Sequence, residues 1–314
     1  MKKELMRQGF LFFGLLFCVS FSFAQQDSSF SHYMFNQQII NPAYAGARGL
    51  TSFTSIVRSQ WSGIEGAPLT QTLSFNTPIT SKKLGFGLSV LNDKIGPIST
   101  TSFDIDLAYH LRLNRKDHRL SIGLKAGALG YLLDSDKINT SISGDPSFES
   151  DLDRKLIPNI GFGLYYYTQN FYLGFAVPKL IESKSFEIER HAYFLGGGLF
   201  NINKNFMLKP SLMYKQTKSI AAFDASVLGI VNELFWVGIQ VRNVVDTTNF
   251  KPANNLGTTA LFGLSLGERF SVGYSYGIPS SMTNKGFNTS THELMLRFDL
   301  SARVKGYLRS PRFF

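Results

Sequence analysis

The chain has 314 residues, is 44% apolar and carries a formal charge of +10. This ordinary apolar content does not indicate a run of transmembrane helices, and the length fits one large domain or two medium ones. The unusual counts are 29 Phe, 13 Tyr and 28 Gly beside a single Cys. They suit a sheet with an apolar outer face and small residues on its inner face. A nucleic-acid partner is not indicated, because a secretory signal precedes the rest of the chain.

Residues 1–24 are predicted to be a secretory signal peptide. A basic start precedes the apolar stretch Phe10–Phe23, which is too short to span a bilayer, and small residues favour cleavage between Ala24 and Gln25. A lipoprotein is the alternative, since Cys18 follows two leucines, but the bulky Phe17 stands where a lipobox has a small residue. Cleavage after Ala24 would remove the only cysteine, so the mature chain could form no disulfide of its own.

The first mature segment, residues 25–49, mixes aromatic side chains with Asn, Pro and Gly and shows no clear period. Asn41-Pro42 and Ala45-Gly46 indicate turns, and the many large apolar groups argue against a disordered leader. We expect this segment to cap or enter the periplasmic mouth of a barrel formed by the rest of the chain. Residues 302–314 form a basic tail that we also expect on the periplasmic side. The candidates for plugging or periplasmic contact are Tyr33, Phe35, Asn41, Pro42, Tyr44, Arg309 and Arg312.

Between residues 50 and 301 the sequence shows about fourteen strand-like stretches. In His292–Leu300 every second residue from Leu294 is apolar, and the residues between are mostly charged. Successive side chains of a strand point to opposite faces, so one face of this stretch is wholly apolar. Ser102–Leu113, Leu84–Val90 and Phe270–Tyr276 repeat the pattern. A closed barrel in a membrane needs it in every strand, because one face meets lipid and the other the lumen.

The connections between these stretches alternate in length from end to end. Even-numbered connections such as Gln169–Asn170 and Asn232–Glu233 are short, whereas odd-numbered ones such as Leu133–Pro158 and Gly277–Thr291 are long. Membrane barrels have short periplasmic turns, long outer loops and both chain ends in the periplasm. The sequence therefore predicts an all-β protein, a transmembrane antiparallel outer-membrane β-barrel of about fourteen strands.

Small residues recur on the predicted inner face. They would either leave room for the N-terminal segment or mark bends that help the sheet to close, and the sequence leaves both explanations open. These residues are Gly85, Gly87, Gly161, Gly163, Gly196 and Gly198.

Few groups suit catalysis. Asp104, Asp106 and His110 share one strand face, but at about 3.3 Å per residue Asp106 and His110 are roughly 13 Å apart, beyond hydrogen-bond reach. We expect these charges to be neutralised across neighbouring strands inside the lumen. No phosphate-cradling loop, nucleophile elbow or zinc spacing occurs in the sequence. We therefore predict no catalytic residue, no cofactor and no metal site, and no enzymatic activity.

The predicted outer loops are the candidate partner surfaces. The longest is acidic, but Lys137-Ile138-Asn139 does not continue the ligand order of an EF-hand, which favours a solvated loop that faces a partner. Trp61 ends the first strand and would be either a membrane-interface anchor or a rigid aromatic contact. Lys94 lies in a predicted compact turn, Asn92–Pro97. The candidates for partner binding are Trp61, Lys94, Asp134, Asp136, Asp145, Asp151 and Asp153.

Several stretches resemble the PorP/SprF family of type IX secretion outer-membrane proteins. Among them are HYMFNQQIINPAYAG (His32–Gly46), RSQWSGIEGAPLTQTLSFNTPI (Arg58–Ile79), the Asn-Asp-Lys-Ile-Gly-Pro block (Asn92–Pro97), LKPSLMYK (Leu208–Lys215) and HELMLRFDL (His292–Leu300). The resemblance implies a barrel without enzymatic activity that serves the secretion and surface attachment of large adhesin-like cargo, through the C-terminal domain of the cargo. Some members of the family are needed for gliding and others are core parts of the apparatus.

We accordingly expect a non-enzymatic protein of the outer membrane. Its expected partners are a type IX cargo protein, periplasmic or outer-membrane subunits of the secretion apparatus, and outer-membrane lipid, with no nucleic acid. The alternative function is a passive channel or transporter for small molecules. That alternative predicts conductance or uptake by the purified barrel.

Overall fold

The computed structural model describes residues 29–79, 83–115, 117–134, 155–183, 188–218, 220–246, 251–252, 257–267, 269–278 and 290–300. The predicted signal peptide and the basic tail with Arg309 and Arg312 lie outside the described residues. So do four acidic candidates of the longest outer loop: Asp136, Asp145, Asp151 and Asp153. Within the described part, no helix is long and apolar enough to cross a membrane.

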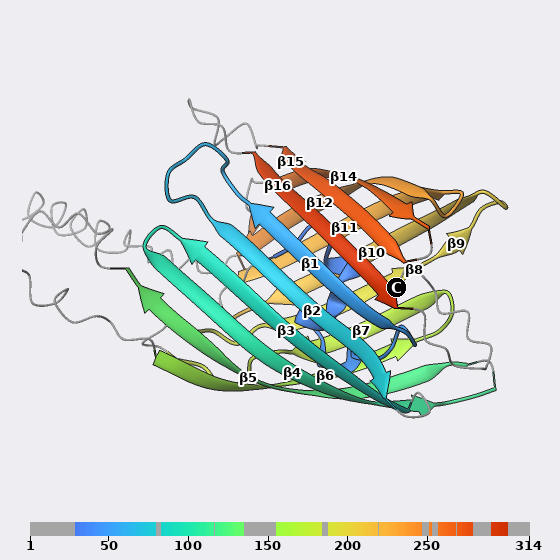
Figure 1. The fold of residues 1–314 in the computed structure, drawn as a ribbon, viewed down its shortest axis with the longest axis horizontal. Helices are drawn as coiled ribbons and strands as arrows, with labels where there is room; N and C mark the ends of the chain where they lie inside the picture. Colours follow the sequence, from blue (N-terminus) through green and yellow to red (C-terminus); the bar gives the residue numbers. More distant parts are fainter. Residues whose placement is uncertain are drawn as a thin grey trace, which may run out of the picture.

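The described chain forms one closed antiparallel barrel (Figure 1). The sheet has sixteen strands, two of which, β9 (Phe200–Asn201) and β13 (Lys251–Pro252), are two residues long, so fourteen strands build the wall. Each wall strand pairs with its neighbours in the chain, and β1 pairs with β16 from Thr51↔Leu300 to Ser59↔His292, which closes the ring. The predicted fold and strand count are confirmed. The wall strands are β1 (Thr51–Ser59), β2 (Leu69–Ile79), β3 (Leu84–Ile95), β4 (Ile98–Arg112), β5 (Arg119–Leu133), β6 (Lys155–Tyr167), β7 (Phe171–Val177), β8 (Ala192–Gly198), β10 (Phe206–Gln216), β11 (Ile220–Val231), β12 (Phe235–Asp246), β14 (Gly257–Leu266), β15 (Phe270–Ile278) and β16 (Thr291–Leu300).

The wall is apolar outside and polar inside. In β16 the side chains of Glu293 and Arg297 are buried, whereas Leu294 and Phe298 are at least 40% exposed on the outer face. The same alternation runs through the other wall strands and leaves a belt of exposed Leu, Ile, Val and Phe side chains. Closure gives every wall strand a neighbour on both sides, and the apolar belt matches lipid. The alternation predicted from the sequence is therefore confirmed.

Two connections differ from the prediction. Only Gly96 and Pro97 separate β3 from β4, and only residues 217–219 separate β10 from β11, so these two odd-numbered connections break the predicted alternation of long and short. The predicted compact turn Asn92–Pro97 is mostly strand. Gly96 has φ 57, which a two-residue hairpin turn requires at its first central position. The prediction ended β3 too early. Apolar and polar residues alternate only in the earlier part of the strand, where its outer face meets lipid, and the last residues of β3 are mostly polar.

The two ends of the barrel can be told apart by their connections. The short connections 168–170, 202–205, 232–234 and 267–269 lie where β1 begins and β16 ends, and we call this the turn end. The opposite end, with the connections 60–68 and 134–154, is the loop end. Membrane barrels keep their short turns in the periplasm and their longer loops outside, so the turn end faces the periplasm and the loop end faces outward.

Residues 29–49, which we call the inner segment, lie inside the ring of strands (Figure 1). They form three single-turn 3-10 helices, η1 (Tyr33–Phe35), η2 (Gln37–Ile39) and η3 (Pro42–Tyr44). Asn41 caps η3 by accepting the Ala43 N–H at 2.9 Å, and Pro42 occupies its first position. Each helix is only three residues long, and Asn36 and Asn41 lie between them.

Candidate functional site

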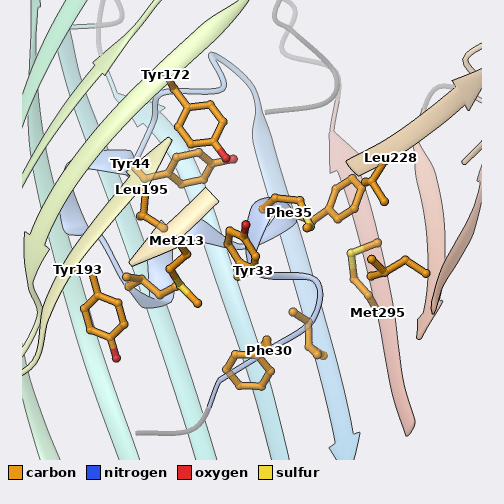
Figure 2. Packing of buried hydrophobic residues seen from close by; sticks show 14 of the residues in the cluster. Phe30, Tyr33, Phe35, Tyr44, Tyr172, Tyr193, Leu195, Met213, Leu228 and Met295 are labelled. Carbon is orange, nitrogen blue, oxygen red and sulfur yellow. The ribbon is translucent and has the colours of Figure 1, made fainter. Parts of the chain in front are cut away.

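Aromatic side chains join the inner segment to the barrel wall (Figure 2). The Phe35 ring lies 5.2 Å from the Trp236 ring of β12, and the Tyr44 ring meets Tyr165 of β6 edge-on at 5.5 Å. Phe30, at the start of the segment, belongs to the same buried cluster. Because these side chains are removed from water, their packing stabilises the segment in the lumen.

Small wall residues make room for the backbone of the inner segment. A methyl group added at Gly85 of β3 would lie 1.8 Å from the Ala45 carbonyl oxygen, and one at Gly123 of β5 would lie 2.2 Å from the Ala43 nitrogen. One at Gly163 of β6 would lie 2.0 Å from Asn41 Oδ1. Gly85, Gly87 and Gly163 therefore leave room for the segment, which was one of the two explanations open from the sequence. Gly161, Gly196 and Gly198 instead have atoms of the wall or its loops as their nearest neighbours: Pro178, Leu173 and Phe200.

We expect Gly123→Ala to destabilise the folded barrel by about 1–3 kcal/mol, the usual cost of overpacking, because the new methyl group meets backbone atoms that cannot move aside alone. Denaturant unfolding in detergent micelles would measure the change. Gly130→Ala in the same strand is the matched control, since its nearest atom would be 3.7 Å away. Equal stability of the two variants would contradict the close fit at Gly123.

Glu293 of β16 holds the start of the inner segment. Its two carboxylate oxygens accept the backbone N–H groups of Ser31 and His32, each at 2.8 Å, and His32 Nδ1 lies 2.7 Å from Oε1. Arg58 Nε of β1 lies 3.9 Å from Oε2. The side chains of Glu293 and His32 are completely buried. Glu293 thus connects the segment with both strands of the β1–β16 seam.

A second set of contacts holds the rest of the segment at the turn end. The Arg48 guanidinium donates to both carboxylate oxygens of Asp299, at 2.7 and 3.0 Å. Arg297 donates to the Phe35 carbonyl oxygen, and Lys209 Nζ lies 4.4 Å above the Phe35 ring. Bidentate, charge-assisted bonds of this kind are among the stronger ones in proteins. Strand β16 therefore contacts the segment at both of its ends.

Polar side chains attach the segment to β2 and β3, on the other side of β1 from β16. Gln38 Nε2 donates to the carbonyl oxygens of Phe75 and Leu88, at 3.0 and 3.1 Å. Asn76 donates to Gln38 at 2.9 Å and accepts the Gly46 N–H at 3.0 Å. These bonds satisfy polar groups that would otherwise be buried without partners.

The lumenal charges pair across strands, as predicted. Lys125 of β5 lies 3.0 Å from Asp106 and 3.8 Å from Asp104 of β4. His110 Nε2 contacts the Ala45 carbonyl oxygen at 2.8 Å instead. The carboxylates and the imidazole therefore have separate partners and form no dyad. Among the described residues, no three His, Cys, Asp or Glu side chains are grouped to hold a metal ion.

Three ionisable groups of the inner segment, Tyr33, Tyr44 and Arg48, keep their ordinary charge states. Burial raises the pKa of the Tyr33 and Tyr44 phenols. Burial alone would lower the pKa of the Arg48 guanidinium, but the Asp299 carboxylate outweighs it and the pKa is raised. The phenols therefore stay neutral and Arg48 stays charged at physiological pH.

The predicted candidates of the inner segment have clear positions. Tyr33, Phe35, Asn41, Pro42 and Tyr44 are all buried inside the wall. Asn41 Nδ2 also donates to the Leu164 carbonyl oxygen of β6 at 2.9 Å. Whether these residues block the passage of ions, or contact a periplasmic partner, stays a prediction.

The three described outer candidates gather around the β3–β4 turn at the loop end. Trp61 lies in the loop after β1 and is 45% exposed. A hydrogen bond joins this loop to the β3–β4 turn: the Gly96 N–H donates to the Gly66 carbonyl oxygen at 2.9 Å. Asp134 follows β5, and its N–H donates to the Pro97 carbonyl oxygen at 2.9 Å. Lys94 is exposed but lies in β3, not in a turn as predicted.

Sequence reasoning missed the residues that hold the inner segment. Glu293, Arg297 and Asp299 all lie in the stretch that first indicated the barrel. Their charge was visible as the polar face of that strand, but their partners are more than 250 positions away in the chain. The sequence offered one signal: charged residues on a face that points into the lumen are buried and require partners.

The closed wall, the apolar belt and the polar interior define an outer-membrane β-barrel protein. The family model described as "Type IX secretion system membrane protein PorP/SprF" matches residues 22–298. The chain therefore belongs to the PorP/SprF family, as its resemblance predicted. No curated protein matches the chain.

Solved barrels are similar only at a distance. Omp33 of Acinetobacter baumannii is 10% identical with a TM-score of 0.46, and the match covers 80% of this chain and 98% of Omp33. A KdgM porin is 7% identical with a TM-score of 0.40, covering 80% and 99%. A mutant of the Rh. blastica porin is 8% identical with a TM-score of 0.36, covering 80% and 99%.

Proposed function

We propose that this barrel supports the secretion or surface anchoring of adhesin-like type IX cargo by binding the C-terminal domain of the cargo at the loop end, without enzymatic activity. The observation that carries the proposal is the occupied interior. The inner segment meets the wall through aromatic packing, paired charges and hydrogen bonds, and this arrangement suits a rigid binding scaffold better than an open conduit.

Family membership supports the type IX part of the proposal. The Trp61 loop supports the binding part, because an exposed aromatic side chain on a loop tied to its neighbour is a typical anchor for a protein partner. Subunits of the apparatus would approach the turn end, where Lys83, Arg115, Lys204 and Arg269 are exposed.

Deleting the gene and quantifying the proteins of the cell surface and the medium tests the proposal. Loss of one or two large adhesins is expected for a dedicated cargo partner, and loss of the whole type IX set for a core component. A strain complemented with the wild-type gene is the control. An unchanged set of secreted proteins would contradict the proposal and favour the passive channel.

A further inference from the structure

The inner segment has a direction inside the barrel. Ser31 and His32 bind Glu293, the third residue of β16, which pairs with Arg58 near the loop end of β1. Phe35 binds Arg297, four residues closer to the turn end of β16. Successive parts of the segment therefore follow β16 from the loop end towards the turn end.

The later residues of the segment keep to the turn end. Arg48 binds Asp299, which pairs with Ser52 at the start of β1. The backbone at Ala45 packs on Gly85, the second residue of β3, and Ala43 packs on Gly123, near the turn end of β5. At about 3.3 Å per strand residue, Glu293 and Asp299 are separated by roughly 20 Å along the wall. The segment spans this distance before β1 begins.

We propose that residues 29–49 enter the lumen from the cell-surface end of the barrel, so that the chain runs inward from the outer loops to the periplasmic end before it enters the wall. This reverses the simplest expectation for a barrel, whose N-terminal residues precede β1 on the periplasmic side. It is independent of the proposed cargo function.

Cysteine labelling of intact cells tests the direction. The parent is the full chain with Cys18→Ser, and a membrane-impermeant maleimide is the probe. Asp27→Cys places a thiol two positions before Ser29. Glu65→Cys, in the exposed loop after β1, is the outward control, and Asn203→Cys, in the exposed turn before β10, is the periplasmic control.

We expect positions 27 and 65 to be labelled in intact cells and position 203 only after the outer membrane is permeabilised. Labelling at position 27 only after permeabilisation would overturn the proposal. If position 27 is unreactive in both states, a flexible epitope extension inserted after Ala24 decides. Antibody binding to intact cells supports the outward terminus, and binding only after permeabilisation overturns it.

Discussion

A chain lacking residues 25–46 is expected to conduct ions through planar bilayers as discrete openings, whereas the intact chain stays near the baseline. The deletion removes aromatic, amide and backbone groups that lie inside the wall and contact it. It leaves a ring of fourteen strands with polar side chains such as Asn76, Gln240 and Ser226 facing inward. A polar lumen of this size hydrates and conducts once nothing occupies it.

Single-channel recording of the purified barrels would measure the difference. Deletion of residues 302–314 is the matched control, because it also shortens the chain at one terminus but leaves the inner segment in place. If both chains stay near the baseline, the plug prediction is contradicted. If both chains conduct equally, it is also contradicted, and the passive channel is favoured.

Glu293→Ala is expected to destabilise the folded barrel by about 3–5 kcal/mol, the usual cost of removing one partner of a buried ion pair. The change leaves the N–H groups of Ser31 and His32 without an acceptor and removes the carboxylate nearest to Arg58. Each buried donor left unsatisfied adds its own desolvation cost. Glu293→Gln keeps the shape and one acceptor oxygen, so a smaller loss is expected for it.

Denaturant unfolding followed by tryptophan fluorescence suits this measurement, because Trp236 is buried against Phe35 of the inner segment. Glu182→Ala is the control. Glu182 forms an ion pair with Arg190 in which both side chains are more than half exposed, and such surface pairs contribute at most about 1 kcal/mol. If Glu293→Ala is no more destabilising than Glu182→Ala, the inner segment does not depend on this carboxylate.

Local sequence was sufficient for the wall. The alternation in Ser102–Leu113 and His292–Leu300 appears as strands β4 and β16, because the two-residue period of a strand sets each side chain towards lipid or lumen without regard to distant residues. The same reasoning wrongly predicted a turn at Asn92–Ile95, which is the end of β3. Where a strand extends past the membrane, its outer face meets water and need not be apolar, so the alternation no longer shows where β3 ends.

For the interior, the sequence supplied the residue types but not their partners. The aromatic and amide groups of residues 25–49 indicated a packed segment, and the lumenal charges of β4 indicated pairing across strands. Which lumenal groups receive the segment could not be deduced, because Arg48 and Asp299 are separated by nearly the whole barrel in the chain.

The sequence by itself therefore determined the class of fold, the two faces of the wall and the strand count, all of which follow from local periodicity and turn chemistry. Only the tertiary structure decided that the inner segment runs from the loop end to the turn end and that Glu293 and Asp299 hold it. The physical reason is ring closure. It brings β1 beside β16 and points their polar faces into a common lumen. A buried charge there is stabilised by the groups that the closed wall places next to it, and these are distant in the sequence.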